Sequence, residues 1–288
     1  GPAPPPRRRQ EVRTPMQTVL FTKLFLGQGL EEVARATADL GFDGVDLLVR
    51  KGFHVDPGEP GKIAAAVKLL QAGGLRVPMA TCDLTDPAGA TAEPLLGALA
   101  QAGIGVLRLG YWKYDPARGY LGFLDQARRQ LEGFEALGRK LGIKLAVQLH
   151  GDTIHGSGAQ TYLLMKDRDP AFIGAYPDPG NQVVQDGRED WRFTFEVLRP
   201  WLCCVGMKNG GWFPKTLERS GQWRWHSDWM ALPDGMVPWS DILAHLARQK
   251  FDGLLTFHSH YEVPYAQVLD RTRLDLGFAR AAFAAGAA

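Results

Sequence analysis

The fold is decided by a phrase at residues 40–47, LGFDGVDL, in which a glycine turn leads from an Ala/Leu-rich amphipathic segment into a short apolar run. Glycine just after a helix supplies the left-handed residue that ends it, and a buried strand follows. The phrase recurs at residues 72–77 (AGGLRV), 102–107 (AGIGVL), 141–147 (LGIKLAV) and 251–255 (FDGLL). The first four copies lie roughly 30 to 40 residues apart, which is the length of one βα unit.

Apolar runs without the phrase complete a set of eight expected strands, at about residues 18–23, 44–49, 76–81, 105–110, 144–150, 172–177, 202–208 and 253–259. Helices are expected at about 29–40, 60–73, 92–102, 120–141, 157–167, 189–198, 239–249 and 266–284. Eight alternating units predict an α/β fold, a single-domain (β/α)8 TIM barrel. A doubly wound sheet is the alternative, but residues 23–29 (KLFLGQG) lack the G-x-G-x-x-G turn that it requires.

Composition narrows the class of protein. A chain of 288 residues with 45% hydrophobic content can bury a large core. The net charge is only +2, and the one dense basic run, Arg7–Arg9, lies in a proline-rich leader, so no nucleic-acid partner is expected. No apolar run reaches the roughly 20 residues of a membrane span. We expect residues 1–16 to be a disordered or tag-derived leader and residues 17–288 to be the barrel domain.

The three cysteines bear on the compartment. Cys203 and Cys204 are adjacent, so on a strand they point to opposite faces and a disulfide framework is not expected. A reducing, cytoplasmic location fits this pattern best, with a removed export leader left open.

Polar side chains gather where the expected strands end, which is where a TIM barrel carries its active site. If Val147, Leu149 and Phe257 face the helices, the alternating polar residues face the barrel axis. We predict His258, Lys208 and His150 as catalytic residues. The predicted substrate-binding residues are Arg50, Arg108, Trp112, His155, Asn181, His260 and Trp212.

Two kinds of chemistry fit these side chains. Carboxylate, imidazole and amide oxygen together suit a divalent ion such as Mn²⁺, Zn²⁺ or Mg²⁺, and Gln148, Asp178 and His258 are the predicted ligands. Such an ion would chelate substrate oxygens and stabilise an enediolate. In the second hypothesis no metal binds, and the His residues, Lys208 and Asp178 act as acids and bases.

At five segments the chain resembles the xylose isomerase-like TIM barrels, the superfamily of sugar phosphate isomerases/epimerases and endonuclease IV. The segments are residues 41–47 (GFDGVDL), 145–150 (LAVQLH), 174–181 (GAYPDPGN), 205–209 (VGMKN) and 253–258 (GLLTFH). The resemblance implies one divalent metal held by two Glu, one Asp and one His. Asp178 matches the Asp, whereas Gln148 and His258 stand at the Glu positions and Gly206 stands at the His position.

The resemblance predicts an isomerase- or epimerase-like enzyme that acts on a sugar, a keto sugar or a polyol, by metal-assisted proton transfer next to a carbonyl group. A lyase or dehydratase that uses His/Lys chemistry and a non-catalytic sugar-binding barrel are the alternatives. Endonuclease activity is disfavoured because the acidic ligands and an excess of positive charge are missing.

Residues 209–252 form a long segment between the last two expected strands and contain Trp212, Trp223, Trp225, Trp229 and Trp239. Long loops are usually functional, and indole rings stack on sugars or pack against a second subunit. We expect a lid or substrate-contacting insertion, with a homo-oligomer left open.

Overall fold

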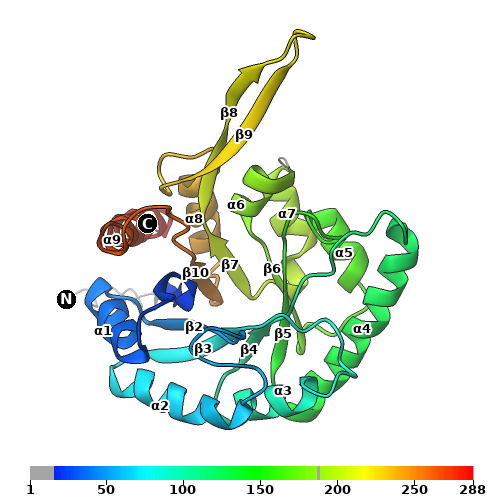
Figure 1. Cartoon of the computed structure of the whole chain (residues 1–288), viewed down its shortest axis with the longest axis vertical. Helices are drawn as coiled ribbons and strands as arrows, with labels where there is room; N and C mark the ends of the chain where they lie inside the picture. Colours follow the sequence, from blue (N-terminus) through cyan, green and yellow to red (C-terminus); the bar gives the residue numbers. More distant parts are fainter. Residues whose placement is uncertain (1–15, 187–188, 288) are drawn as a thin grey trace, which may run out of the picture.

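Eight parallel strands form a barrel surrounded by helices, as the repeated phrase predicts (Figure 1). The computed structural model describes residues 16–186 and 189–287. The predicted leader therefore lies outside the described residues, except for Met16. No helix within those two ranges is both long and apolar enough to cross a membrane.

The barrel strands are β1 (Gln17–Phe21), β2 (Gly44–Leu48), β3 (Arg76–Thr81), β4 (Val106–Arg108), β5 (Lys144–Gln148), β6 (Ile173–Tyr176), β7 (Cys204–Met207) and β10 (Leu254–Phe257). The longer helices are α1 (Leu30–Leu40), α2 (Ile63–Ala72), α3 (Ala92–Gln101), α4 (Tyr120–Leu141), α5 (Gly158–Met165), α7 (Trp191–Val197), α8 (Trp239–Arg248) and α9 (Tyr265–Gly286). Short turns of helix are η1 (Thr22–Phe25), η2 (Pro60–Lys62), α6 (Pro179–Asn181), the π-helical η3 (Gln182–Asp186) and η4 (Arg199–Trp201).

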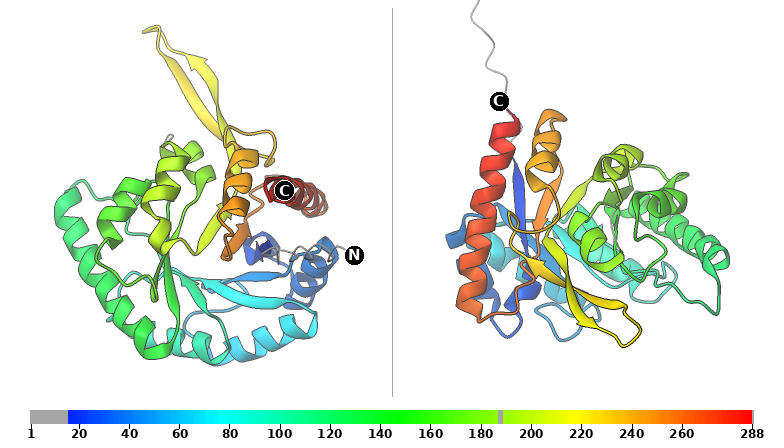
Figure 2. Two further views of the ribbon diagram at one scale, coloured as in Figure 1. Left: turned by 180° about the vertical axis from the view of Figure 1, so that it is seen from behind. Right: turned by 90° about the horizontal axis from the view of Figure 1, so that it is seen from above.

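The sheet runs in the order β6-β5-β4-β3-β2-β1-β10-β7, so the strand after each helix pairs with its predecessor. Two backbone bonds close the ring between the end strands: the Cys203 N–H donates to Ala175 O at 3.0 Å, and the Gly206 N–H donates to Pro177 O at 2.9 Å. On the far side, α8 and α9 lie next to each other over β10 (Figure 2).

The recurring glycine ends the preceding helix, as the sequence predicts. Helix α1 ends at Gly41, which has a φ of 89°, and α4 ends at Gly142, which has a φ of 73°. Positive φ is the left-handed region that glycine enters without a steric penalty. Each helix therefore stops at once and the chain turns directly into the next strand.

Side chains on the strands separate into two buried layers. Val147, Leu149 and Phe257 belong to the large cluster between strands and helices. A small cluster that includes Ala146 and Tyr176 lies inside the barrel. The expected alternation is confirmed, so the polar residues at the strand ends are directed toward the axis.

The long tryptophan-rich segment differs from the expected loop, because it contains an antiparallel hairpin of β8 (Asn209–Leu217) and β9 (Trp223–Met230). The hairpin projects away from the barrel (Figure 1). Its turn contains Gly221, which has a φ of 84°, and Trp223 and Trp225 alternate with polar residues as in a strand. At its base, Trp212 Nε1 donates to Val183 O at 2.5 Å.

Candidate active site

A cavity opens at the carboxyl ends of the barrel strands. Its outer part measures about 550 Å³, and an inner part of about 100 Å³ shares His150, His258 and His260 with it. A larger hollow of about 900 Å³, between α7 and α8, shares no residue with this cavity. The inner part is lined by Phe21, Lys23, Arg50, Arg108, Tyr111, His150, Asn181, Gln185, Lys208, Trp229, His258 and His260.

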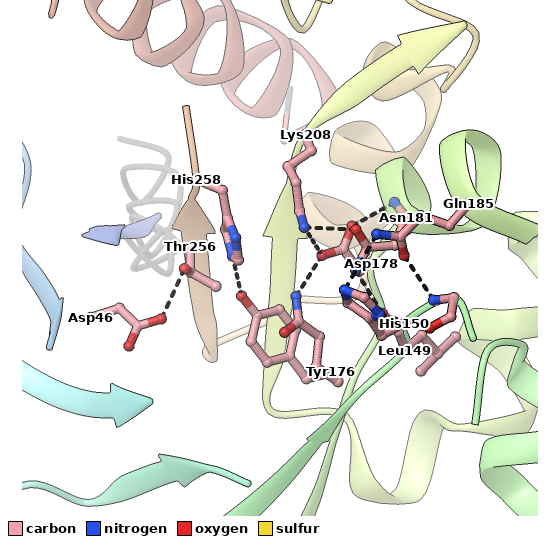
Figure 3. Close-up of polar contacts among 12 residues, drawn as sticks. Asp46, Leu149, His150, Tyr176, Asp178, Asn181, Gln185, Lys208, Thr256 and His258 are labelled. Atoms are coloured by element: carbon pink, nitrogen blue, oxygen red, sulfur yellow. Dashed lines mark hydrogen bonds and ion pairs between the residues drawn. The ribbon is translucent and has the colours of Figure 1, made fainter. Parts of the chain in front are cut away.

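Asp178 follows β6 and is the centre of a buried network (Figure 3). Its Oδ1 accepts the backbone N–H of Asn181 at 2.9 Å, which caps the short α6. Its Oδ2 accepts Gln148 Nε2 at 2.7 Å. Tyr111 OH in turn donates to Gln148 Oε1 at 2.9 Å. A buried carboxylate that accepts several hydrogen bonds is held in one position.

The Lys208 ammonium completes this network. Its Nζ lies 2.9 Å from Asp178 Oδ2 and 2.8 Å from Asn181 Oδ1, and it lies over the ring of Trp229, 5.3 Å from the centroid. Burial lowers the pKa of Lys208, and the attraction of Asp178 opposes that effect. We call Asp178, Gln148, Asn181 and Lys208 the Asp178 network.

Two glycines allow these groups to approach one another. A Cβ atom at Gly180 would lie 2.6 Å from Lys208 Cβ, and one at Gly206 would overlap the carboxylate of Asp178. Larger residues at these positions would push the ion pair apart. Gly206 is therefore explained by the position of Asp178.

Three histidines line the cavity beside the network. Tyr176 OH lies 2.6 Å from His258 Nε2, and His150 Nδ1 donates to Gly151 O at 2.8 Å. Neither ring nitrogen of His260 is hydrogen-bonded to another described residue, and its ring packs against Trp229. Burial lowers the pKa of all three, and Lys208 adds to the effect. All three rings are therefore neutral near pH 7, and of the three only His260 has both ring nitrogens free of other described residues.

The backbone between two of these histidines is in a sparsely populated conformation. Ser259 has a φ of 50°, in the left-handed region that non-glycine residues rarely adopt. Strand β10 ends at Phe257, so both histidines lie beyond the strand. The turn at Ser259 places the ring centroids of His258 and His260 5.5 Å apart. Strained residues of this kind cluster at functional sites.

Positive charge also accumulates around Lys23 and Arg108, which line the inner cavity. Arg108 is only 3% exposed; it donates from one Nη to Leu109 O and stacks on Tyr111. Lys23 lies at the rim. Among the described residues neither has an ion-pair partner, whereas Arg50 pairs with Asp83 at 2.6 Å. We call Lys23 and Arg108 the Arg108 side.

Asp46 is a further buried carboxyl, inside the barrel beside Thr256 (Figure 3). Thr81 Oγ1 donates to it at 2.8 Å. Burial raises its pKa to about 6. Asp46 does not line the cavity.

The predicted metal ligands do not fit a divalent ion. Asp178 Oδ2 already accepts hydrogen bonds from Lys208 Nζ and from the amide nitrogen of Gln148. His258 Nε2 is hydrogen-bonded to Tyr176 OH. Within the described residues, no three His, Cys, Asp or Glu side chains are grouped to hold a metal. A cation placed at this carboxylate would meet the Lys208 ammonium at short range.

The structure brings seven predicted site residues together in the inner cavity: His258, Lys208, His150, Arg50, Arg108, Asn181 and His260. Three others are placed differently. Trp112 is buried and donates from Nε1 to Gln130, and His155 uses Nδ1 for Gln148 O and Nε2 for the Trp112 N–H. Trp212 lies on the hairpin, and its indole nitrogen is bound to Val183.

Five residues line the inner cavity but are absent from the predicted site: Phe21, Lys23, Tyr111, Gln185 and Trp229. Lys23 lies in η1, two residues after the end of β1, and was detectable as a polar residue at an expected strand end. Gln185 enters through the π-helix η3, where its side chain contacts His150 and Gly151. No sequence pattern used above distinguishes Trp229 from the other hairpin tryptophans.

Comparison with known proteins agrees with this fold. A profile described as xylose isomerase-like TIM barrel matches residues 34–280. No curated protein matches the sequence significantly. Three solved structures illustrate the structural similarity.

The first is the apo form of the 3-keto-D-glucoside 4-epimerase YcjR from E. coli, with a TM-score of 0.66 and 14% identity over 93% of this chain and 100% of the other. The second is a xylose isomerase-like TIM barrel protein from Mycobacterium smegmatis in complex with magnesium, with a TM-score of 0.65 and 16% identity over 93% and 98%.

The third is AsbF of Bacillus anthracis, named as a probable 3-DHS dehydratase, with a TM-score of 0.61 and 13% identity over 90% and 98%. Identities this low establish the fold alone, whereas the profile covers most of the sequence. The chain therefore belongs to the xylose isomerase-like TIM barrel family.

Proposed function

We propose that this protein is a sugar isomerase- or epimerase-like enzyme that moves a proton next to the carbonyl group of a sugar, a keto sugar or a related polyol, using its own His and Lys side chains. Membership of the family and an epimerase among the structural neighbours support the reaction class. The observation that carries the proposal is the Lys208 ammonium, 2.9 Å from Asp178, in a cavity with three neutral histidines.

Lys208 is suited to stabilise the negative charge that develops on a carbonyl oxygen when the neighbouring carbon loses a proton. Its ammonium is fixed by Asp178 and Asn181 and borders the cavity. A buried charge that is fixed in advance stabilises an enolate strongly, because little reorganisation accompanies the reaction. Asp178 serves as a positioning residue for Lys208.

His260 is the best placed proton carrier. Both of its ring nitrogens are free of other described residues, whereas His258 is held by Tyr176 and His150 by Gly151. His150 and His260 follow β5 and β10, which are not neighbours in the barrel. In an isomerisation, His260 takes the proton from one carbon and, as the imidazolium, returns it to the neighbouring carbon. In an epimerisation, His260 takes the proton and later releases it to solvent, and His150, after protonation from solvent, supplies a proton to the opposite face.

The cavity also suits a substrate of this size. An outer volume of about 550 Å³ falls within the usual range for small-molecule sites. Trp229, at the base of the hairpin, offers an aromatic ring beside Lys208 and His260. Such a ring can pack against the apolar face of a sugar.

Elimination by a lyase or dehydratase is the second candidate, because it begins with the same proton removal. The dehydratase among the structural neighbours supports it. The two candidates differ in product, since elimination releases water or an alcohol and isomerisation releases nothing.

The test is exchange of carbon-bound hydrogen. The purified protein, depleted of metal by a chelator, is incubated in D2O with a panel of keto sugars and polyols, and deuterium incorporation is followed by NMR. We expect the chelated protein to incorporate deuterium. The exchange rate should fall by at least about 100-fold in His260→Asn and in Lys208→Met. The hairpin control His226→Asn should exchange at the rate of the native protein. Exchange that returns only with added divalent metal contradicts the proposal. Sugar binding without exchange identifies a non-catalytic barrel.

A further inference from the structure

We propose that Lys23 and Arg108 bind an oxyanion group of the substrate, so that this site acts on an acidic sugar or polyol rather than on a neutral one. This inference rests on the proposed function only in treating the bound anion as part of a substrate. The anion-binding site itself follows from charge, burial and shape.

The inner cavity is unbalanced in charge. Among the residues whose side chains the structure describes, Lys23, Arg50, Arg108 and Lys208 line it and no acidic residue does. Two of the four form ion pairs with carboxylates that do not line the inner cavity: Arg50 pairs with Asp83, and Lys208 pairs with Asp178. Lys23 and Arg108 have no salt-bridge partner among the described residues, although Asp83 attracts both of them and Asp46 attracts Arg108 at longer range. The cavity therefore has a positive potential that favours an anion.

Arg108 is the stronger part of the argument. A guanidinium that is 3% exposed has lost most of its water, and the structure returns one hydrogen bond, to Leu109 O, and the face of Tyr111. Buried charges are normally paired, because an unpaired one is costly. A planar fork with free N–H groups matches the two oxygens of a carboxylate or of a phosphate.

Lys23 extends this site to the rim. Its pKa is lowered by partial burial and by the like charges of Arg50 and Arg108. Mutual repulsion of this kind is relieved when an anion binds between the cations. Lys23 also borders the outer cavity, so an incoming ligand meets it first.

The first experiment uses small anions as probes. Melting temperature is measured with inorganic phosphate and with acetate, each against chloride at matched ionic strength. We expect at least one of the two to stabilise the native protein. The gain should vanish in Arg108→Gln and shrink in Lys23→Met, and it should persist in Lys51→Met, an exposed lysine that does not line the cavity. Lys23→Met covers the case in which Arg108→Gln fails to fold.

A second measurement identifies the source of the oxyanion. Calorimetric titration compares D-glucuronate, D-glucose 6-phosphate and D-glucose. Preference for the first indicates a carboxylate and preference for the second a phosphate, and either supports the inference. We expect Arg108→Gln to weaken the preferred ligand by roughly tenfold or more. No gain from either small anion, or the same gain in Arg108→Gln as in the native protein, overturns the inference.

The two proposals fail separately. Anion binding without hydrogen exchange keeps this inference and removes the proposed activity. Hydrogen exchange on a neutral keto sugar, with no response to anions, does the reverse.

Discussion

The Asp178 network and the Arg108 side differ in whether their charges are paired within the protein. In the Asp178 network, a fully buried carboxylate meets an ammonium and two further donors, so its charge is satisfied within the protein. On the Arg108 side, two cations have no carboxylate partner among the described residues. A charge neutralised internally contributes to the folded state, whereas an uncompensated one favours a ligand. The comparison separates the groups that stabilise the structure of the site from those that we propose bind the anionic group of a ligand.

The largest effect is expected where the network is broken. Asp178→Asn leaves the Lys208 ammonium buried without its partner, and we expect a loss of roughly 3–5 kcal/mol in the free energy of unfolding. The double variant Asp178→Asn/Lys208→Met should lose less than the sum of the two single changes, because neither charge is left alone. Urea unfolding followed by Trp fluorescence gives these values.

The exposed pair Lys62–Glu59 supplies the matched control for that cycle. Its two side chains are 67% and 52% exposed, so removing either should cost less than about 1 kcal/mol. Equal losses in the buried and exposed pairs, or additive losses in the double variant, would contradict the distinction drawn between the two sides.

Acid should unfold the protein through its buried histidines. The pKa values of His150, His155, His258 and His260 are lowered from 6.5, chiefly by burial. Below pH 6.5 the unfolded chain therefore takes up protons that the folded chain does not, and stability falls as pH falls. Each net proton contributes a slope of about 1.4 kcal/mol per pH unit.

Two carboxyls oppose this trend. Burial raises the pKa values of Asp46 and Asp275 to about 6, so the folded chain binds their protons first and gains stability as pH falls toward 3.8. Four histidines outweigh two aspartates, and urea unfolding between pH 7.5 and 5 should show a net loss. Asp46→Asn should steepen the slope, and a stability that is constant or rises over this range would refute the balance.

The smallest effect is expected on the Arg108 side without ligand. Arg108→Gln removes one hydrogen bond and a stacking contact but leaves no carboxylate unpaired, so it should cost no more than about 1.5 kcal/mol. Lys23→Met should change the free energy of unfolding by less than about 0.5 kcal/mol. Thermal and urea unfolding of ligand-free protein measure both. A loss as large as that of Asp178→Asn would place Arg108 among the groups that build the site.

The sequence predicted the barrel well because its signals are local and repeated. The glycine that ends each helix and the apolar run that follows lie within a few residues, and Gly41 and Gly142 have the expected positive φ. The hairpin was missed because a long segment with many Trp residues was interpreted by length, although the alternation around Trp223 and Trp225 indicates a strand.

The site was located more easily than its interactions were predicted. Positions at the strand ends placed His258 and Lys208 in the cavity, because barrel topology alone determines where strand ends meet. The Lys208–Asp178 pair depends on contacts between β7 and the turn after β6, and side-chain contacts between separate strands leave no local pattern. For the same reason, the burial of Trp112 and His155 was not predicted.

Gly206 limits which residues the protein can accept beside Asp178. Any side chain introduced there would collide with the carboxylate of Asp178 as it is now placed, so Gly206→His alone would displace the carboxylate and separate it from Lys208. Converting this site to a ligand set of two Glu, one Asp and one His would therefore require coordinated substitutions at residues 148, 206, 208 and 258, rather than a single replacement at residue 206.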